Sequence, residues 1–407
     1  MIAHCRKIAL MSEEVGRTTR TFLSPPMHEV HSYFREWMES LAMQVTVDAA
    51  GNLRGVYSCG RNAAPRLVIG SHLDTVPDAG AFDGVLGVVI GVGLIESLRG
   101  GKLGIDIEVI GFSEEEGVRF GTPFIGSRAV VRQLDETMLA KTDSNGVSIA
   151  EAIRVFGLDP AKLPDAALHP ATIGYLEFHI EQGPVLDSVG LPLAIVAGIA
   201  GQSRFLVTFI GKSNHAGTTP MHLRHDALAA SAEWIVLVEV TAHSTDGLVA
   251  TVGRIHANPG VGNVIPGRVE ASLDVRHPSD PIRLAAVASL RKEAEEIALR
   301  RGLTVEWTEQ LAQPTVLLDR AMSLKLKHAA EAAGFPTPRL FSGAGHDAMV
   351  IAPHIPSGML FLRSPGGISH HPDESVLEAD VEAVMRTGLQ FIASLNAEYG
   401  GDSSCIN

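Results

Sequence analysis

Two compact apolar segments, each ending in a cluster of ionisable residues, constrain the fold of this 407-residue chain more than any other feature. The segment RLVIGSHLDTV at 66–76 runs into a polar turn, and IDIEVIGFSEEEG at 105–117 ends in three acids. Residues 84–98 between them are apolar and rich in glycine, which indicates a buried, closely packed helix. This order of strand, polar tip, helix, strand and polar tip predicts an α/β sheet. Since ligands of open α/β sheets bind at the carboxyl ends of strands, both tips are candidate sites.

The middle of the chain predicts a second, inserted unit. SRFLVTFIGKS and GRVEASLDVRH alternate as strands do, while ALAASAEWIVLVEVTAH and PIRLAAVASLRKEAEEIALRRG show helical patterns. Two strands interleaved with two helices indicate a small α+β domain, and an α/β pattern returns after Pro314. A chain of this length is expected to form two domains. We therefore predict a catalytic domain made of residues 1–190 and 311–407, with a lid domain at 191–310.

Charge and cysteine content exclude several classes of function. The formal net charge is −13 and no basic run is present, which argues against a nucleic-acid partner. Cys5, Cys59 and Cys405 form no CxxC pair, so free thiols in a reducing cytosol are expected. The first residues do not form a signal peptide, and the longest apolar run, at 84–95, is too short to span a bilayer. We expect a soluble, cytoplasmic protein with no membrane partner.

The polar turn after the first strand contains residue types that suit a metal. His72 and Asp74 are separated by one residue, and Asp83 follows in a glycine-bounded turn. Imidazole and carboxylate groups suit Zn²⁺ or a similar divalent ion, and Asp74 would then orient His72. Taken alone, an HxD pattern also fits an ordinary solvated turn.

The second tip carries Glu114, Glu115 and Glu116. A run of acids is usually a solvated loop. Adjacent carboxylates repel one another unless a cation or a shared proton relieves them, and here a buried strand precedes them. One Glu would then bind metal while its neighbour moves protons. His179 in YLEFHIEQG, together with His370 and His371 in GGISHHPDES, supplies further imidazoles.

A series of stretches along nearly the whole chain resembles one amidase family, which includes allantoate amidohydrolases, N-carbamoyl-L-amino acid hydrolases and β-ureidopropionases. The matching stretches are GSHLDTV…FDGVLGV, FSEEEGVRF…GSR, HIEQGPVL, GIAGQSR, HAGTTPM, GNVIPG, DVRH, SGAGHDAM and GGISHHP. The resemblance implies a zinc-aminopeptidase-like α/β catalytic domain with an inserted α+β lid domain. It also implies a homodimer formed through that lid.

The same resemblance implies the site residues. Two divalent ions bridged by Asp83 would be held by five ligands, namely His72, Asp83, Glu116, His179 and His370. In SHHP the ligand is expected at His370, because the family pattern is Ser-His-x-Pro, with His371 as the alternative. The candidate catalytic residues are Glu115 as general base, Asp74, and His215 as a donor to the oxyanion that often comes from the partner subunit. The candidate substrate contacts are Gln182, His215, Asn263, Arg276, Gly345 and His346.

The expected reaction is metal-dependent hydrolysis of a ureido (carbamoyl) C–N bond, which releases ammonia and CO₂. Imidazole and carboxylate ligands suit Zn²⁺ or Mn²⁺, and also Co²⁺ or Ni²⁺. Arg276 offers the planar, permanently charged fork that a substrate carboxylate requires. EEEGVRF, GIAGQ, SGAGHDAM and FLRSPGGISH are more similar to allantoate amidohydrolases, so allantoate, an intermediate of purine-ureide catabolism, is the first expected substrate. An N-carbamoyl-L-amino acid, or the substrate of a β-ureidopropionase, is the alternative.

Two other functions fit the sequence less well. A non-catalytic ligand sensor is disfavoured because all five ligands and Glu115 are present. A dipeptidase or aminoacylase is disfavoured by HIEQG and GAGHDA, which resemble the ureido-cleaving branch. Residues 28–31 (HEVH) are one residue short of HExxH, and histidines three apart on an amphipathic helix at 26–43 predict surface positions. GKS at 211–213 lacks the upstream glycine of a phosphate loop.

Overall fold

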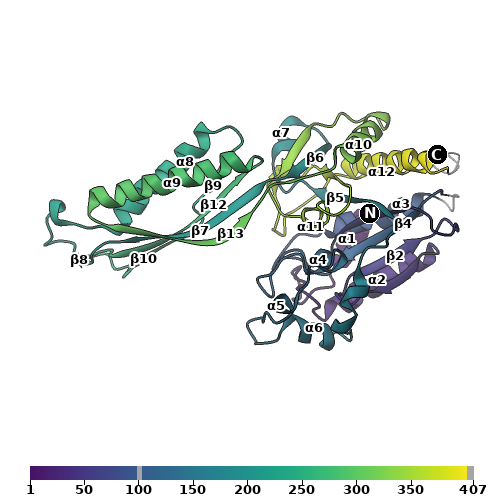
Figure 1. Ribbon diagram of the computed structural model, residues 1–407, viewed down its shortest axis with the longest axis horizontal. Helices are drawn as coiled ribbons and strands as arrows, with labels where there is room; N and C mark the ends of the chain where they lie inside the picture. The colour runs from purple at the N-terminus through teal and green to yellow at the C-terminus, as the bar shows by residue number, and fades with distance from the viewer. Residues whose placement is uncertain (99–102, 401–407) are drawn as a thin grey trace. The chain divides into compact units, whose positions relative to one another are not determined.

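The computed structural model describes residues 1–98 and 103–400 (Figure 1). Within it the chain divides into two compact units, Met1–Ala197 with Leu317–Asn407, and Gly198–Val316. The inserted unit therefore begins and ends several residues later than the range 191–310 predicted from the sequence. The later end follows from β13 (Thr304–Gln313), which belongs to the sheet of the inserted unit.

The first unit is built on a nine-stranded sheet in the order β1-β2-β4-β3-β5-β16-β6-β14, with β15 beside β6. The strands are β1 (Gln44–Val47), β2 (Leu53–Tyr57), β3 (Arg66–His72), β4 (Asp106–Phe112), β5 (Thr172–Ile180), β6 (Leu193–Ile199), β14 (Val316–Leu317), β15 (Arg339–Ser342) and β16 (Ser357–Leu362). β3 pairs in parallel with both β4 and β5, and β5 pairs in parallel with β16. The carboxyl ends of these four strands consequently lie along one edge.

Helices cover this sheet, so its central strands are almost entirely buried. The helices are α1 (Ile2–Ala9), α2 (Pro26–Ser40), α3 (Val85–Ser97), α4 (Ile125–Val130), α5 (Glu136–Leu139), α6 (Ile149–Val155), α7 (Val185–Val189), α10 (Arg320–Ala332), α11 (Asp347–Ile351) and α12 (Glu378–Glu398), with 3₁₀ turns at Pro160–Ala166 and Pro365–Gly367. All seven residues of β4 are buried, as expected for a strand covered on both faces.

Helix α3 packs directly on β3, β4 and β5. Its residues from Val85 to Ile95 are all buried, and its glycines permit the close approach that the sequence indicated. A Cβ on Gly87 would lie 2.2 Å from the carbonyl oxygen of Phe178 on β5. Substitution of Gly87 by alanine would therefore push the helix away from the strand, together with Asp83, which lies just before the helix.

Helix α2 corrects one prediction. His28 is exposed and stacks on Phe156 with ring centroids 3.8 Å apart. His31 is only 5% exposed and meets the same ring edge-on, so its predicted surface position is wrong. His31 lies four residues after Met27 and three before Phe34, so it shares the buried face of the helix with these apolar side chains.

The second unit is an antiparallel sheet in the order β10-β12-β7-β13, with β9 beside β12. Its elements are β7 (Gly201–Ile210), β8 (Asn214–His215), a 3₁₀ turn at Met221–Leu223, α8 (Ala227–Ser244), β9 (Val249–Thr251), β10 (Ile255–Asn258), β11 (Val264–Ile265), β12 (Arg268–His277), α9 (Asp280–Arg301) and β13. β8 and β11 form a separate two-stranded ribbon. The sequence predicted only β7 and β12 among these strands.

Helices α8 and α9 pack together along one face of this sheet (Figure 1). Trp234 of α8 is fully buried and donates its indole N–H to the Leu290 carbonyl of α9 at 3.0 Å. Residues along β12 alternate between buried and partly exposed positions, so this sheet buries one face only.

Among the described residues, no helix combines the length and the apolar composition needed to cross a bilayer. Cys5 is buried, Cys59 is partly exposed, and neither forms a disulfide. Cys405, also expected to be a free thiol, lies outside the described residues.

Candidate metal centre

Five side chains converge at the carboxyl edge of the first unit's sheet. His72 ends β3, His179 lies near the end of β5, and Glu116 follows β4. Asp83 lies just before α3, and His370 lies in the loop after β16. They meet because these four strands are parallel, so that segments far apart in the sequence share one edge.

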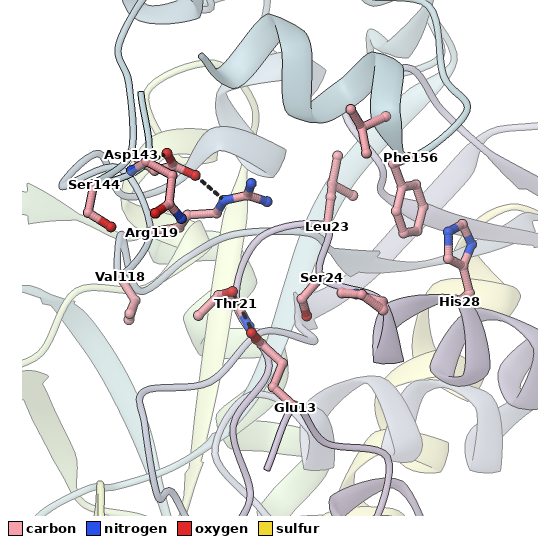
Figure 2. Close-up of a pocket in the computed structure, with 13 residues that line it drawn as sticks. Glu13, Thr21, Leu23, Ser24, His28, Val118, Arg119, Asp143, Ser144 and Phe156 are labelled. Carbon is pink, nitrogen blue, oxygen red and sulfur yellow. Dashed lines mark hydrogen bonds and ion pairs between the residues drawn. The ribbon is translucent and has the colours of Figure 1, made fainter. Parts of the chain in front are cut away.

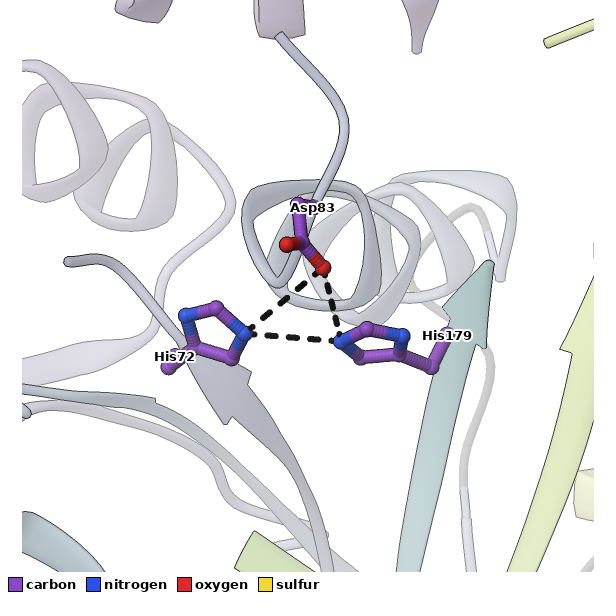
Figure 3. A group of neighbouring side chains, drawn as sticks. All are labelled: His72, Asp83 and His179. Atoms are coloured by element: carbon purple, nitrogen blue, oxygen red, sulfur yellow. Dashed lines mark hydrogen bonds and ion pairs between the residues drawn. The ribbon is translucent and has the colours of Figure 1, made fainter. Parts of the chain in front are cut away.

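The first group consists of His72, Asp83 and His179 (Figure 3). Asp83 Oδ1 lies 3.4 Å from His179 Nε2 and 4.0 Å from His72 Nε2. The Nδ1 atom of His72 lies 3.0 Å from the Asp74 carbonyl, and that of His179 lies 2.9 Å from the Ile180 carbonyl. A carbonyl oxygen accepts a hydrogen bond only from a nitrogen that carries a proton, so each Nδ1 is protonated. In a neutral imidazole the Nε2 then carries the lone pair, and both Nε2 atoms face the Asp83 carboxylate, as in metal-binding histidines.

The second group consists of Asp83, Glu116 and His370. His370 Nε2 lies 3.2 Å from Asp83 Oδ2 and 3.5 Å from Glu116 Oε1. Asp83 thus presents one oxygen to each group. His371 is directed elsewhere, because its Nδ1 lies 3.6 Å from Asp373 and its side chain is 58% exposed. A third group of close donor atoms joins His72, Glu115 and Glu116.

The pKa shifts of these groups show that several carboxylates lie close together in a buried position, where a bound cation would stabilise their charged forms. Burial raises the pKa of Glu115 well above its usual range, against the opposing effect of His72. Burial and the nearby Asp83 raise the pKa of Glu116 to about 7. A hydrogen bond to Asp83 raises the pKa of His370 to about 9. The buried Oε1 of Glu116 accepts no hydrogen bond. Close buried carboxylates of this kind are stabilised by divalent ions, and imidazole and carboxylate donors suit Zn²⁺ or Mn²⁺.

Asp74 contacts three of the residues at this sheet edge. Its two carboxylate oxygens accept the backbone N–H groups of Glu115 at 3.0 Å and Glu116 at 3.1 Å. Its Oδ1 also lies 3.5 Å from His72 Nδ1. Asp74 therefore contacts both His72 and the loop that carries Glu115 and Glu116.

Three predicted substrate contacts surround these groups. The amide nitrogen of Gln182 lies 3.0 and 3.2 Å from the two Asp83 oxygens and 3.3 Å from His370 Nε2. A Cβ on Gly345 would lie 3.5 Å from Glu115 Oε1. His346 packs edge-on against His179 with centroids 4.5 Å apart, and burial holds its pKa well below the usual range.

The other three predicted contacts lie in the second unit. His215 on β8 pairs with Val264, and the Ala216 N–H donates to the Asn263 carbonyl at 2.9 Å, so His215 and Asn263 are neighbours. Arg276 on β12 donates to Asp274 through Nε at 2.8 Å and Nη2 at 2.9 Å. Asp274 also accepts from Arg204 at 2.8 Å, and its role was not predicted.

Two buried acids near the ligands were also not predicted. Glu177 accepts the Ala348 N–H at 2.8 Å and the Tyr175 hydroxyl at 3.1 Å. It lies two residues before His179 on β5, and the period of a strand would have placed both side chains on one face. Glu374 accepts the N–H groups of Phe82 and Asp83. No local pattern in HPDES distinguishes Glu374 from an ordinary loop acid.

A separate cavity of about 510 Å³ lies in the first unit (Figure 2). Its lining includes Ser24, His28 and Arg119, whose Nε bonds Asp143 at 3.0 Å. None of the residues that line it is a candidate ligand of the metal centre. The candidate site is therefore the group of convergent donor atoms, not this cavity.

Comparisons with known proteins identify the family of this chain. Residues 68–394 match the model of peptidase family M20/M25/M40. The chain is 39% identical to allantoate deiminase 1 of Glycine max over 97% of this chain and 89% of that protein. It is 41% identical to an N-carbamoyl-L-amino acid amidohydrolase of Geobacillus stearothermophilus over 88% of each. The crystal structure of an amidase of the hydantoinase/carbamoylase family from Burkholderia multivorans superposes with a TM-score of 0.90 at 31% identity, over 97% of this chain and 96% of that one.

Proposed function

Because the chain belongs to peptidase family M20/M25/M40, we propose that it hydrolyses a ureido C–N bond of a small carboxylate substrate and releases ammonia and CO₂. Family membership confirms the resemblance and the α/β fold class that the sequence predicted, and it makes the chain a hydrolase of C–N bonds. One observation carries the proposal: buried Asp83 offers an oxygen to each of two ligand groups, with Glu115 beside them.

We propose that two divalent ions, Zn²⁺ or Mn²⁺ with Co²⁺ or Ni²⁺ as further candidates, are held by these groups. His72, Asp83 and His179 would hold one ion, and Asp83, Glu116 and His370 the other. Bound ions of this kind polarise a carbonyl oxygen and lower the pKa of water. Asp83 would be the shared ligand, which its two differently directed oxygens support.

Glu115 is the proposed general base. It is 7% exposed, lies among the ligands, and is held through its backbone by Asp74. In this mechanism the Glu115 carboxylate accepts a proton from the attacking water and returns it to the departing amine nitrogen. General acid–base catalysis of this kind contributes about 10²–10⁴ in rate. Burial raises the pKa of Glu115, and a raised pKa makes its carboxylate a stronger proton acceptor.

Allantoate is the first proposed substrate, on the stretches named above and on the plant allantoate deiminases, which align over nearly the whole chain. An N-carbamoyl-L-amino acid is the second, because an amidohydrolase of that specificity has 41% identity. Both substrates carry a carboxylate, for which the Arg276 fork is the proposed partner, and a carbonyl for which His215 is the proposed donor. Gln182, Asn263, Gly345 and His346 are the further proposed contacts.

We propose that the second unit forms a homodimer through α8. Leu228, Ala232, Val236 and Val240 are exposed and spaced four residues apart, so they form one apolar stripe along the helix. Val236 and Val240 are 58% and 55% exposed. Substitution of both valines by lysine should convert a dimer to a monomer in analytical ultracentrifugation. A wild-type monomer would contradict the dimer and the supply of His215 by a partner.

A cytoplasmic location is also proposed, because Cys5 and Cys59 are free thiols and such thiols persist in a reducing compartment.

The test of function is ammonia release by Mn²⁺-reconstituted protein, with allantoate and a panel of N-carbamoyl-L-amino acids in parallel. Fast release from allantoate alone supports the first substrate. Preference for a carbamoyl amino acid transfers the assignment to the second substrate and leaves the roles of the ligands and Glu115 in place. No release from any ureido substrate, combined with cleavage of a dipeptide, would overturn the proposal.

A further inference from the structure

Glu374 joins two loops that carry candidate ligands. Its Oε1 atom accepts the backbone N–H of Phe82 at 2.9 Å and that of Asp83 at 3.0 Å. Its Oε2 atom accepts the hydroxyl of Ser369 at 3.2 Å, one residue before His370. The side chain is 5% exposed, so water does not compete freely for these bonds. A single carboxylate therefore fixes the backbone of Asp83 relative to the His370 loop, across nearly 300 residues of sequence.

The contact between these loops is also closely packed. A Cβ placed on Gly80 would lie 2.4 Å from the Glu374 Cβ, so the turn that leads to Asp83 rests directly on this side chain. The Glu374 N–H donates to the His371 carbonyl at 3.0 Å, which closes the loop on itself. His370 adopts a left-handed backbone with φ of 55°, a conformation that a non-glycine residue keeps only when its surroundings hold it.

The other ligands do not depend on Glu374. His72 lies at the end and His179 near the end of a regular strand, and the Nδ1 of each contacts a backbone carbonyl. Glu116 is held by Asp74 through its backbone N–H. Among the five candidate ligands, only Asp83 and His370 both lie in loops that Glu374 connects by hydrogen bonds.

We propose that Glu374 is a positioning residue that sets the separation of Asp83 and His370, and thereby the affinity of the ion held by Asp83, Glu116 and His370. The ion held by His72, Asp83 and His179 is affected much less, because two of its three ligands lie on strands. This inference rests on the proposed dinuclear centre.

The experiment is a Mn²⁺ titration of the metal-free, full-length protein by calorimetry, with bound metal counted by mass spectrometry. Wild type should bind two ions per chain. Glu374→Ala should keep one tight ion and bind the second about 10–100-fold more weakly, the effect typical of losing a hydrogen bond that orients a ligand. The electron paramagnetic resonance signal of a spin-coupled Mn²⁺ pair should be replaced by that of an isolated ion.

Two variants separate positioning from a general loss of structure. Glu374→Gln should bind both ions close to wild-type affinity, because its amide oxygen still accepts both N–H groups. Asp373→Asn is the matched control, since it removes an adjacent carboxylate whose side chain is 78% exposed, and should bind both ions as wild type does. If Glu374→Ala does not fold, Ser369→Ala decides, and it should weaken the second ion alone.

The failures are distinguishable. Fewer than two ions on wild type would contradict the proposed dinuclear centre itself. If Glu374→Ala binds two ions with wild-type affinities, the role of Glu374 is overturned and the proposed function stays intact. Where Glu374→Ala does not fold, the same result for Ser369→Ala has the same meaning. A folded Glu374→Ala that binds both ions equally more weakly than wild type would also overturn the role of Glu374.

Discussion

The carboxylate of Asp74 accepts the backbone N–H of Glu115 at 3.0 Å, although 41 residues separate them. The same carboxylate accepts the N–H of Glu116 at 3.1 Å. One buried acid after β3 thus holds both the proposed base and a proposed ligand after β4. Because Asp74 holds Glu115 through its backbone N–H, this contact leaves the carboxylate oxygens of Glu115 available for proton transfer.

Glu115→Gln is expected to lower kcat by about 10²–10⁴, because the amide does not accept a proton. Metal content should remain at the wild-type value, since the proposed ligand is Glu116. Steady-state kinetics and metal counting on the same preparation check this prediction. Wild-type turnover by a fully loaded Glu115→Gln would remove Glu115 from the role of base.

Arg276→Ala is expected to raise KM about 10–100-fold with a smaller change in kcat, because a charged hydrogen bond contributes about 1.5–3 kcal/mol. Arg276→Lys should not restore KM, since an ammonium group lacks the planar fork. Asp274→Asn should raise KM less, because it removes the carboxylate that orients Arg276.

The matched control for Arg276 is Arg268→Ala on the same strand. Arg268 is exposed and pairs with Glu270, so its removal should leave KM unchanged. An unchanged KM for Arg276→Ala would place the substrate carboxylate elsewhere.

The adjacent histidines give a direct test of ligand assignment. His370→Ala should lower the metal content toward one ion per chain, because His370 Nε2 faces Asp83 and Glu116. His371→Ala should retain two ions, since that ring is directed at Asp373. The reverse result would exchange the two assignments.

His31 predicts a dependence of stability on pH that is independent of the metal centre. Burial lowers its pKa from 6.5 to about 4 in the folded protein. The unfolded chain therefore binds the extra proton between these values, and stability falls as the pH is lowered from 6.5 to 4. The contribution of His31 over this range is about 3 kcal/mol.

His31→Leu should reduce the loss of unfolding free energy across this range, because leucine does not titrate. Chemical denaturation of metal-free wild type and variant at pH 4.5 and 7 gives the comparison. Identical differences between the two pH values in both proteins would show that His31 is not protonated selectively in the unfolded chain.

The local pattern of the chain was sufficient for much of the fold and for the chemistry of the site. The apolar segments that form β3, β4 and α3 were recognisable because the spacing of apolar residues along the sequence reflects the period of a strand or a helix. His72, Asp83 and Glu116 were candidates because they lie at the ends of these strands or in the polar segments that follow them, although each pattern alone also fits a solvated turn. Family resemblance, not periodicity, supplied their individual roles and those of the contacts in the second unit.

The tertiary structure decided which side chains meet. β13 was missed because its residues alternate weakly, and it becomes a strand only by pairing with β7. His31 is buried because Phe156 packs over it. Glu374 reaches the backbone of Asp83 because parallel pairing brings the loop after β16 to the same sheet edge as α3. The order of residues along the chain shows the spacing of near neighbours, whereas these contacts depend on strand register and loop closure between residues about a hundred or more positions apart.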